Sequence, residues 1–415
     1  MKIFQNDASL YAIVIPENAK NSELRFAKAV ASILELPMDV IKTDAEKAGE
    51  LEIRVGKTNR TKTAVERFEF ALAADGKNLE FVAGCCFAYE HAYDYFSVNL
   101  AALLEEEKNG ELYREDTTAK IKAAKDTALL GKAGEIRLIY HNVWGWANAP
   151  ASIGWQPGNN AEVEQRSAIM AESYLELEPD VICMQEYTNF MFRACGESGA
   201  INILEKNGYA EVKLPPVDKI ETATPIVYRT STLNLVDSGV HRFTYGGGMD
   251  KFLTWAVFET LRNGKKFAVI SAHLAYQGGE EGQSFRMAQV PLMMYHAELI
   301  KKTHKCNVYF GGDMNCSGFT DPYKLFIRMG AVDTWNLADV TEDRGTHNPY
   351  PSYDVNTGLV FRPRTTNKGT YMTASIDHIF HIARERHYFR KFDILDDTYL
   401  GSASDHSPVL LDFDF

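Results

Sequence analysis

The chain has no surplus of basic residues. Its 415 residues carry a formal net charge of −12, and its pI is near 5.5. This balance argues against a protein that binds nucleic acid through a broad basic face. The argument is weaker for an enzyme, because bound cations offset the charge of an acidic site locally.

Long hydrophobic runs are also missing. No segment approaches the ~20 consecutive apolar residues of a membrane span, and the N-terminal M-K-I-F-Q-N-D-A-S-L lacks the continuous apolar stretch of a secretory signal. We therefore expect no membrane span and a cytoplasmic protein, with secretion open if a leader has been removed. No fixed-period repeat or low-complexity segment stands out.

Cysteine does not occur in any pattern that suggests a metal centre or a disulfide framework. Several of the six cysteines lie in apolar strand-like runs rather than at regular loop spacings, so we expect reduced and mostly buried thiols. None recurs among the acidic motifs described below, which makes a zinc or iron–sulfur centre a poor fit. The cysteines are Cys85, Cys86, Cys183, Cys195, Cys306 and Cys316.

Length and composition predict two globular domains. The chain is long for one domain, and its 45% hydrophobic and 24% charged residues are typical of a soluble protein with an ample core. From 105 to 134 the sequence is charged and loses its apolar periodicity, which indicates a linker. We therefore expect a small α/β domain at 1–104 and a second domain at 135–415.

The first region combines strand and helix patterns. Apolar strand-like runs at 10–15 and 51–55 flank a stretch of helical spacing at 22–36. A hairpin turn at 75–78 precedes an aromatic helix at about 87–104.

Four pieces of this region are similar to a domain of known enzymes. They are I-P-E-N-A, E-I-R-V-G-K-T-N-R, D-G-K-N-L and A-Y-E-H-A-Y-D-Y-F. The region resembles the small non-catalytic α/β domain that precedes the barrel in bacterial glycoside hydrolases of the α-glucuronidase and β-hexosaminidase types. No glycosidase barrel fits behind it here. The resemblance implies a domain that packs rather than reacts, with a link to carbohydrate as a hypothesis.

Strand-like runs outnumber helices in the second region. Helical patterns at 161–177 and 284–302 interrupt a series of apolar runs, which disfavours a strict strand–helix repeat and favours two packed sheets with helices outside. The runs are E-I-R-L-I-Y-H-N, P-D-V-I-C-M-Q-E, P-I-V-Y-R, F-L-T-W-A-V-F-E, F-A-V-I-S-A-H, N-V-Y-F-G-G-D, S-I-D-H-I-F and P-V-L-L-D-F.

Polar side chains gather at the tips of these runs. The motifs G-G-D-M-N, I-D-H-I and S-D-H-S each begin or end an apolar run, and three further runs end in Asn, Glu or His. At one sheet edge, such carboxylates, amides and imidazoles suit a hard divalent cation and a phosphate ester. A single residue of this kind is usually a turn or a helix cap, but eight together are not explained by turn chemistry. At or just past the C-terminal ends of their strands we expect Asn142, Glu186, His273, Asp313, Asn315, Asp377, Asp405 and His406.

These motifs, in this order, resemble those of the endonuclease/exonuclease/phosphatase superfamily, which includes deoxyribonuclease I, sphingomyelinases and inositol-polyphosphate 5-phosphatases. The resemblance runs over about 136–415. It implies a four-layer α/β sandwich of two packed mixed sheets. It also implies hydrolysis of a phosphoester with a divalent metal, usually Mg²⁺, with Mn²⁺ as the alternative.

The metal roles expected from the residue types agree with that resemblance. Mg²⁺ takes one or two protein carboxylates and otherwise water and phosphate oxygens. We expect Glu186 to be the principal ligand, with Asn142 and Asp405 near it.

The remaining polar residues suit proton transfer and charge stabilisation. His406 is the expected general base, oriented by Asp377. Asp313 is an alternative, since it also suits orienting or deprotonating the attacking water. Asn315 and His273 are expected to donate hydrogen bonds to phosphate oxygens, and His273 to assist the leaving group.

Two histidines carry further expectations. A His at position 273 resembles the branch of the superfamily that contains deoxyribonuclease I, the sphingomyelinases and the 5-phosphatases. Apurinic endonucleases use Tyr in the corresponding role. His378 follows Asp377 and should point to the opposite face of the sheet, where we expect a structural role.

Two long loops are candidates for substrate binding. One, at 143–160, carries Trp144 and Trp146, whose rings suit stacking on a base, a sugar or a lipid tail or packing of the loop itself. The other, at 342–373, carries Arg362 and Arg364, which suit a second phosphate or ordinary solvation. A glycine triplet at 246–248 is expected to be a turn rather than a phosphate cradle.

Several functions therefore remain open. A phosphodiesterase or phosphomonoesterase acting on a small molecule leads, and a nuclease is second, because basic contacts are scarce. No amphipathic anchor supports action on membrane lipids. A non-catalytic binding module on the same fold is the alternative from another class.

Overall fold

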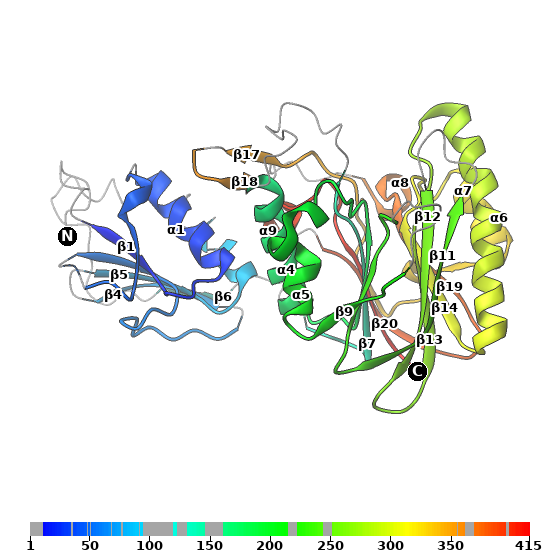
Figure 1. Ribbon diagram of the computed structural model, residues 1–415, viewed down its shortest axis with the longest axis horizontal. Coiled ribbons are helices and arrows are strands. Elements are labelled where there is room, and N and C mark those ends of the chain that lie inside the picture. The colour runs from blue at the N-terminus through cyan, green and yellow to red at the C-terminus, as the bar shows by residue number, and fades with distance from the viewer. Residues whose placement is uncertain are drawn as a thin grey trace. The chain divides into compact units, whose positions relative to one another are not determined.

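The computed structural model describes residues 11–34, 36–47, 49, 51–67, 69–75, 78–90, 92–93, 119–122, 131–145, 161–214, 222–243, 251–354, 356–361, 369–395 and 398–415. The chain divides into two compact units, shown in Figure 1. Unit 1 is Met1–Gly131 with Asp354–Leu359, and unit 2 is Lys132–Tyr353 with Val360–Phe415. Across these described residues, no helix combines the length and the apolar character needed to cross a membrane.

Unit 1 contains a mixed sheet with a helix packed on it. The strand order is β2-β1-β3-β5-β4-β6. The helix α1 buries Phe26, Ala27 and Val30, which share one helical face. Its elements are β1 (Ala12–Ile15), α1 (Asn21–Ile33), η2 (Met38–Val40), β2 (Ile41–Thr43), β3 (Glu52–Val55), β4 (Glu69–Asp75), β5 (Asn78–Ala83) and β6 (Ala119–Lys122).

The structure differs from the sequence prediction at two places in this region, and most of a third predicted element lies outside the described residues. The helix predicted at 22–36 ends at Ile33, because Pro37 has no N–H to continue it and disfavours helical geometry at Leu36. The helix predicted at 87–104 is described only at 86–90 and 92–93. The segment predicted as a linker contains β6, which pairs antiparallel with β4. This edge strand carries Lys120 and Lys122, the charge pattern typical of exposed sheet edges.

Unit 2 is built on two sheets. In the β7 sheet the strand order is β16-β20-β21-β7-β8-β10-β9, and in the β13 sheet it is β11-β12-β13-β14-β19-β15. The strands of the β7 sheet are β7 (Ile136–Asn142), β8 (Val181–Gln185), β9 (Tyr209–Glu211), β10 (Ile226–Arg229), β16 (Val340–Thr341), β20 (Tyr388–Ile394) and β21 (Val409–Asp414). Those of the β13 sheet are β11 (Leu233–Phe243), β12 (Lys251–Thr260), β13 (Lys266–His273), β14 (Asn307–Asp313), β15 (Val332–Asp333) and β19 (Asp377–Ile382).

Helices cover the outer faces of both sheets, while the short α8 (Tyr371–Ala374) and η6 (Thr334–Asn336) pack Tyr371 and Trp335 into the cluster that joins the sheets. The other helices of unit 2 are α4 (Ala161–Leu177), η5 (Arg193–Ser198), α5 (Ala200–Glu205), α6 (Gly279–His304), α7 (Asp321–Arg328) and α9 (Thr398–Gly401), and β17 (Ser352–Asp354) pairs with β18 (Leu359–Phe361). Figure 1 shows α4 and α5 on one side of the paired sheets and α6 and α7 on the other. The predicted arrangement of two packed sheets with helices outside is confirmed.

The β13 sheet is buried on both faces, with an apolar cluster on each. One apolar cluster joins the two sheets and includes Tyr140 and Tyr309, and the other joins the β13 sheet to α6 and α7 and includes Val308 and Phe310. The alternation of Val308, Tyr309 and Phe310 between the clusters follows the pleat of β14. Burial on both faces explains why β14 reads as a continuous apolar run.

Strand pairing gathers the polar tips at one edge of each sheet. Because β13 and β14 are parallel and β14 and β19 antiparallel, His273, Asp313 and Asp377 occupy neighbouring positions on three adjacent strands. Asp377 therefore begins its strand, and Asp405 and His406 precede β21. The expectation that all eight residues follow C-terminal strand ends is wrong for these three. An antiparallel strand reaches the same edge with its first residues.

Two buried histidines lie between the sheets, away from this edge. His381 stacks on Tyr309 with ring centroids 5.0 Å apart, and His387 Nδ1 is hydrogen-bonded to the Tyr309 hydroxyl. Among the described residues neither Nε2 has a hydrogen-bond partner. Burial lowers the pKa of His381 to about 3 and that of His387 to about 4.

Acidification is therefore expected to destabilise the fold through these rings. A histidine whose pKa is lower in the folded state stabilises the protein above its unfolded pKa of about 6.5, and that stability is lost as the pH falls toward the folded value. His387→Gln should lose less stability than the wild type between pH 7 and pH 5, by about 2 kcal/mol. Urea unfolding at each pH measures this difference, and parallel stability curves for the two proteins would contradict it.

Candidate active site

A buried histidine–aspartate pair is the centre of the site. His406 Nδ1 lies 2.8 Å from Asp377 Oδ2. Both side chains are buried, and the backbone N–H of Asp377 donates to Thr346 Oγ1 at 3.2 Å. Burial opposes charge on both groups, but their mutual attraction prevails, so that the pKa of His406 is raised and that of Asp377 is lowered. Nδ1 is committed to Asp377, which leaves Nε2 to act on other groups.

Asp313 connects this pair to the rest of the site. Its Oδ2 accepts a hydrogen bond from Asn142 Nδ2 at 2.9 Å and lies 3.4 Å from His273 Nε2 and 3.9 Å from His406 Nε2. Its Oδ1 accepts from the backbone N–H of Asn315 at 2.8 Å, while Asn315 Nδ2 donates to the Leu274 carbonyl at 3.3 Å. One carboxylate thus lies close to side chains from β7, β13 and the segment before β21.

Glu186 has an unusual backbone that depends on close packing. It follows β8 with a φ of 61°, a left-handed conformation that costs energy for a residue with a side chain. Its Oε1 accepts from Asn142 Nδ2 at 3.1 Å, and its Oε2 from the Gly145 backbone N–H at 3.0 Å. A Cβ on Gly145 would come 1.8 Å from the Glu186 carbonyl oxygen, so only glycine fits there.

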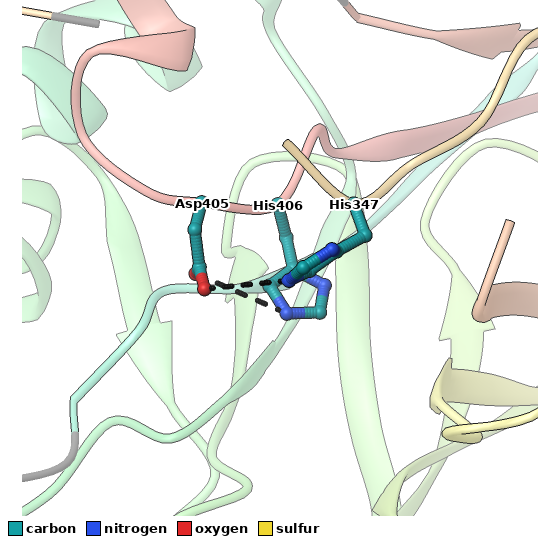
Figure 2. Close-up of side chains that lie close together, drawn as sticks. All are labelled: His347, Asp405 and His406. Carbon is teal, nitrogen blue, oxygen red and sulfur yellow. Dashed lines mark ion pairs between the residues drawn. The ribbon is translucent and has the colours of Figure 1, made fainter. Parts of the chain in front are cut away.

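His347, which the sequence did not single out, joins the site from the 342–373 loop. It pairs as an isolated bridge with His406, and their rings meet edge to face at 5.2 Å. Figure 2 shows both histidines directed toward the carboxylate of Asp405, with His347 Nε2 3.8 Å from Oδ2 and His406 Nε2 3.9 Å from Oδ1. His347 is half exposed, whereas Asp405 is buried.

Lys251 is the second residue that sequence reasoning missed. It begins β12, is buried, and its Nζ lies 2.8 Å from His273 Nε2. Burial and Lys251 lower the pKa of His273 to about 3, while burial lowers the pKa of Lys251, against the opposing charges of Glu186 and Asp313. Only the pairing register of β12 with β13 would have located this lysine. That register sets Leu253 opposite Ala272, next to His273, and so brings the start of β12 to the site.

Of the residues predicted to bind the substrate, the structure describes Trp144. Trp144 is only 7% exposed, with the Arg166 guanidinium 4.8 Å from its ring centre and the Tyr350 ring 5.1 Å away. The exposed aromatic here is Tyr350, at 45%. Trp146, Arg362 and Arg364 lie outside the described residues, so their roles stay predictions. The glycines at 246–248 lie outside them as well.

His378 lies on the side of β19 away from this cluster. Its Nδ1 is 2.7 Å from the Tyr371 hydroxyl and its Nε2 is 2.9 Å from the Cys316 carbonyl oxygen. The side chain is fully buried. Both ring nitrogens thus have partners in the core.

The residue set fits a divalent cation. Close groups of potential ligands are His347 with Asp405 and His406, Glu186 with His273 and Asp313, and Asp313 with Asp377 and His406. Burial and the charge of Asp405 raise the pKa of Glu186, and burial raises the pKa of Asp405. Buried carboxylates that disfavour one another's charge are stabilised by a cation held between them. Their oxygens are the ligands that Mg²⁺ and Mn²⁺ prefer.

Comparison with solved structures identifies the fold. An endonuclease/exonuclease/phosphatase family protein from Bacteroides thetaiotaomicron shares 17% identity, covering 67% of this chain and 94% of that one, with a TM-score of 0.51. A mannosyl-6-phosphatase of the same species shares 18% identity, covering 68% of this chain and 100% of that one, with a TM-score of 0.52. No family model and no curated protein matches the chain.

The chain therefore has the fold of the endonuclease/exonuclease/phosphatase superfamily, an α/β sandwich, and this prediction is confirmed. The resemblance of the first region to a glycoside-hydrolase domain stays a prediction. Because the identities are low, the activity of either protein does not transfer through the fold alone.

The close approach at Gly145 gives a direct test of how Glu186 is held. Gly145→Ala should lower the free energy of unfolding by about 1–3 kcal/mol, because the added methyl group would overlap backbone rather than a flexible side chain. Gly278→Ala, where no atom lies within 4 Å of the added group, is the matched control. Chemical unfolding of both variants measures the difference, and equal stability would show that the 143–145 loop yields easily.

Proposed function

We propose that this protein is a divalent-metal-dependent phosphoester hydrolase. The observation that carries the proposal is the buried pair of His406 and Asp377, 2.8 Å apart, beside two further carboxylates. A base oriented by a carboxylate and a cluster of hard metal ligands both promote phosphoester hydrolysis by water. The similarity in fold to a phosphatase supports the same class of reaction.

The metal would be held by Glu186, with Asn142 and Asp405 as further oxygen ligands and Asp313 as the nearest alternative carboxylate. Mg²⁺ is the proposed ion and Mn²⁺ the substitute. When bound, such an ion polarises the phosphorus–oxygen bond and offsets the charge on the transferred group. In the structure the Asn142 amide nitrogen faces Glu186 and Asp313, the orientation that two negative carboxylates favour.

The protein's own groups would move the proton. His406 accepts a proton from the attacking water at Nε2, since Nδ1 is bound to Asp377. The resulting imidazolium is stabilised by Asp377, Asp405 and Asp313, whose charges favour the protonated ring. Asp313 also suits orienting or deprotonating the attacking water. The base that takes the proton is then either the Asp313 carboxylate or the His406 imidazole. Asn315 is proposed to donate to a phosphate oxygen from its amide.

Metal dependence is the first test. With Mg²⁺ the purified chain should hydrolyse p-nitrophenyl phosphate or its bis-ester, and a chelator should abolish the reaction until Mg²⁺ or Mn²⁺ is restored. Glu186→Gln should raise the metal concentration for half-maximal rate by about tenfold or more, since even the outer partners of metal ligands contribute 10–100-fold. Hydrolysis unaffected by chelation, or absent with every metal and ester, would exclude the proposal.

The histidine–aspartate pair is the second test. His406→Ala and Asp377→Asn should each lower kcat by on the order of 10²–10⁴-fold, because a positioned base contributes about that much. Asp237→Asn is the matched control, since Asp237 pairs with His304 at 3.2 Å outside the site. Stopped assays at saturating Mg²⁺ measure the rates. A loss in the control equal to that in Asp377→Asn would point to folding rather than chemistry.

Two finer alternatives stay open within this class. A nuclease would need basic contacts to a nucleic-acid backbone, and the two arginines predicted to bind a second phosphate, Arg362 and Arg364, lie outside the described residues. A phosphorylated carbohydrate is the other candidate, supported by the fold similarity to a mannosyl-6-phosphatase and by the resemblance of the first region to a glycoside-hydrolase domain.

A further inference from the structure

A buried lysine stands inside the candidate site. Lys251 is only 2% exposed, and β12 runs antiparallel to β13, so that this first residue of β12 lies beside the last residues of β13. Its Nζ reaches His273 Nε2 at 2.8 Å. The exposed ring of Tyr276 is centred 5.6 Å from the same nitrogen, within the range of a cation–π contact.

This contact determines what His273 can do. An ammonium group has donors and no acceptor, so Nε2 of His273 must accept, and the neutral ring then carries its proton on Nδ1. Such an Nε2 has no hydrogen to give to Asp313, 3.4 Å away, or to an anion in its place. His273 therefore positions Lys251, and the donor on this side of the site is the ammonium group.

The charged side chains around Lys251 are residues of the candidate active site. His273 Nε2 lies 3.8 Å from Glu186 Oε1, and the charges of both Glu186 and Asp313 act on the ammonium group. A cation is thus held by the β13 sheet, while the proposed metal ligand Glu186 comes from the β7 sheet. With a metal ion held by Glu186, an anion bound at this site would meet positive charge from both sides.

We propose that Lys251 binds a non-bridging oxygen of the substrate phosphoryl group and makes the site selective for phosphomonoesters. The inference rests on the proposed function and names its substrate class. A monoester carries up to two negative charges and three non-bridging oxygens near neutral pH, as a phosphorylated side chain does. A diester carries one charge, and its second ester group replaces one of those oxygens.

A second ester group removes one negative charge and one of the oxygens that can accept from Lys251. The ammonium group keeps its partner His273 Nε2, at 2.8 Å, whichever ester binds. Its attraction to the phosphoryl group is therefore stronger for a monoester and its transition state than for a diester. The same reasoning assigns to Lys251 the contact with phosphate oxygens that the sequence suggested for His273.

Lys251→Met tests this role, since methionine keeps much of the length of the side chain and removes the charge. Removing one charge from a buried set of opposite charges destabilises a fold, so Lys251→Arg, which keeps the charge, is measured beside it. Lys266→Met, at the exposed start of β13, is the matched control. For p-nitrophenyl phosphate, kcat/KM should fall about 10²–10³-fold in Lys251→Met, as when one oxyanion donor is lost. For the bis-ester it should fall less than about tenfold.

A binding measurement separates this inference from the proposed function. Calorimetric titration of inorganic phosphate in the presence of Mg²⁺ should give a dissociation constant at least about tenfold higher for Lys251→Met than for wild type, and an unchanged value for Lys266→Met. If wild type hydrolyses neither ester, the proposed function fails while this titration still decides the role of Lys251. Equal losses for both esters, or unchanged phosphate affinity, would overturn the inference.

Discussion

The backbone ladder through β13, β14 and β19 is the constraint on which the site depends. It sets His273, Asp313 and Asp377 side by side on three strands. A slip of one residue in any pairing would turn the side chain at that position to the opposite face. The tight fit of β14 between its neighbours opposes such a slip, because a Cβ on Gly311 would come 1.9 Å from the His378 carbonyl oxygen. Main-chain packing thus fixes these positions together with the contacts between the polar side chains.

This arrangement gathers negative charge in the site. Glu186, Asp313, Asp377 and Asp405 are all buried, so their charges need nearby positive groups. His406 offsets the charge on one side, and Lys251 acts on the other. A divalent cation completes this set in the proposed enzyme. The acidic balance of the whole chain therefore says little about the charge of the site once its cations are present.

The sequence predicted most of the strands that carry the site, because each is a clear apolar run ending in a polar residue. It failed where that signal is weak. β11 is largely exposed and carries no clear apolar alternation, and β6 is a short edge strand rich in lysine. Lys251 and His347 were missed for a different reason. Each reaches the site through pairing with a distant strand or segment, and a single sequence does not contain the register of such pairings.

Arg166 links two parts of the site that are far apart in the chain. From α4 its guanidinium donates to the carbonyl oxygens of Val143 and Trp144, which follow Asn142, and at 2.7 Å to that of Ala403, which precedes Asp405. Neither loop can therefore open alone without leaving a buried charged donor unpaired. The two loops should exchange their amide hydrogens as one cooperative unit, so that the ligands expected from opposite ends of this domain are ordered or lost together.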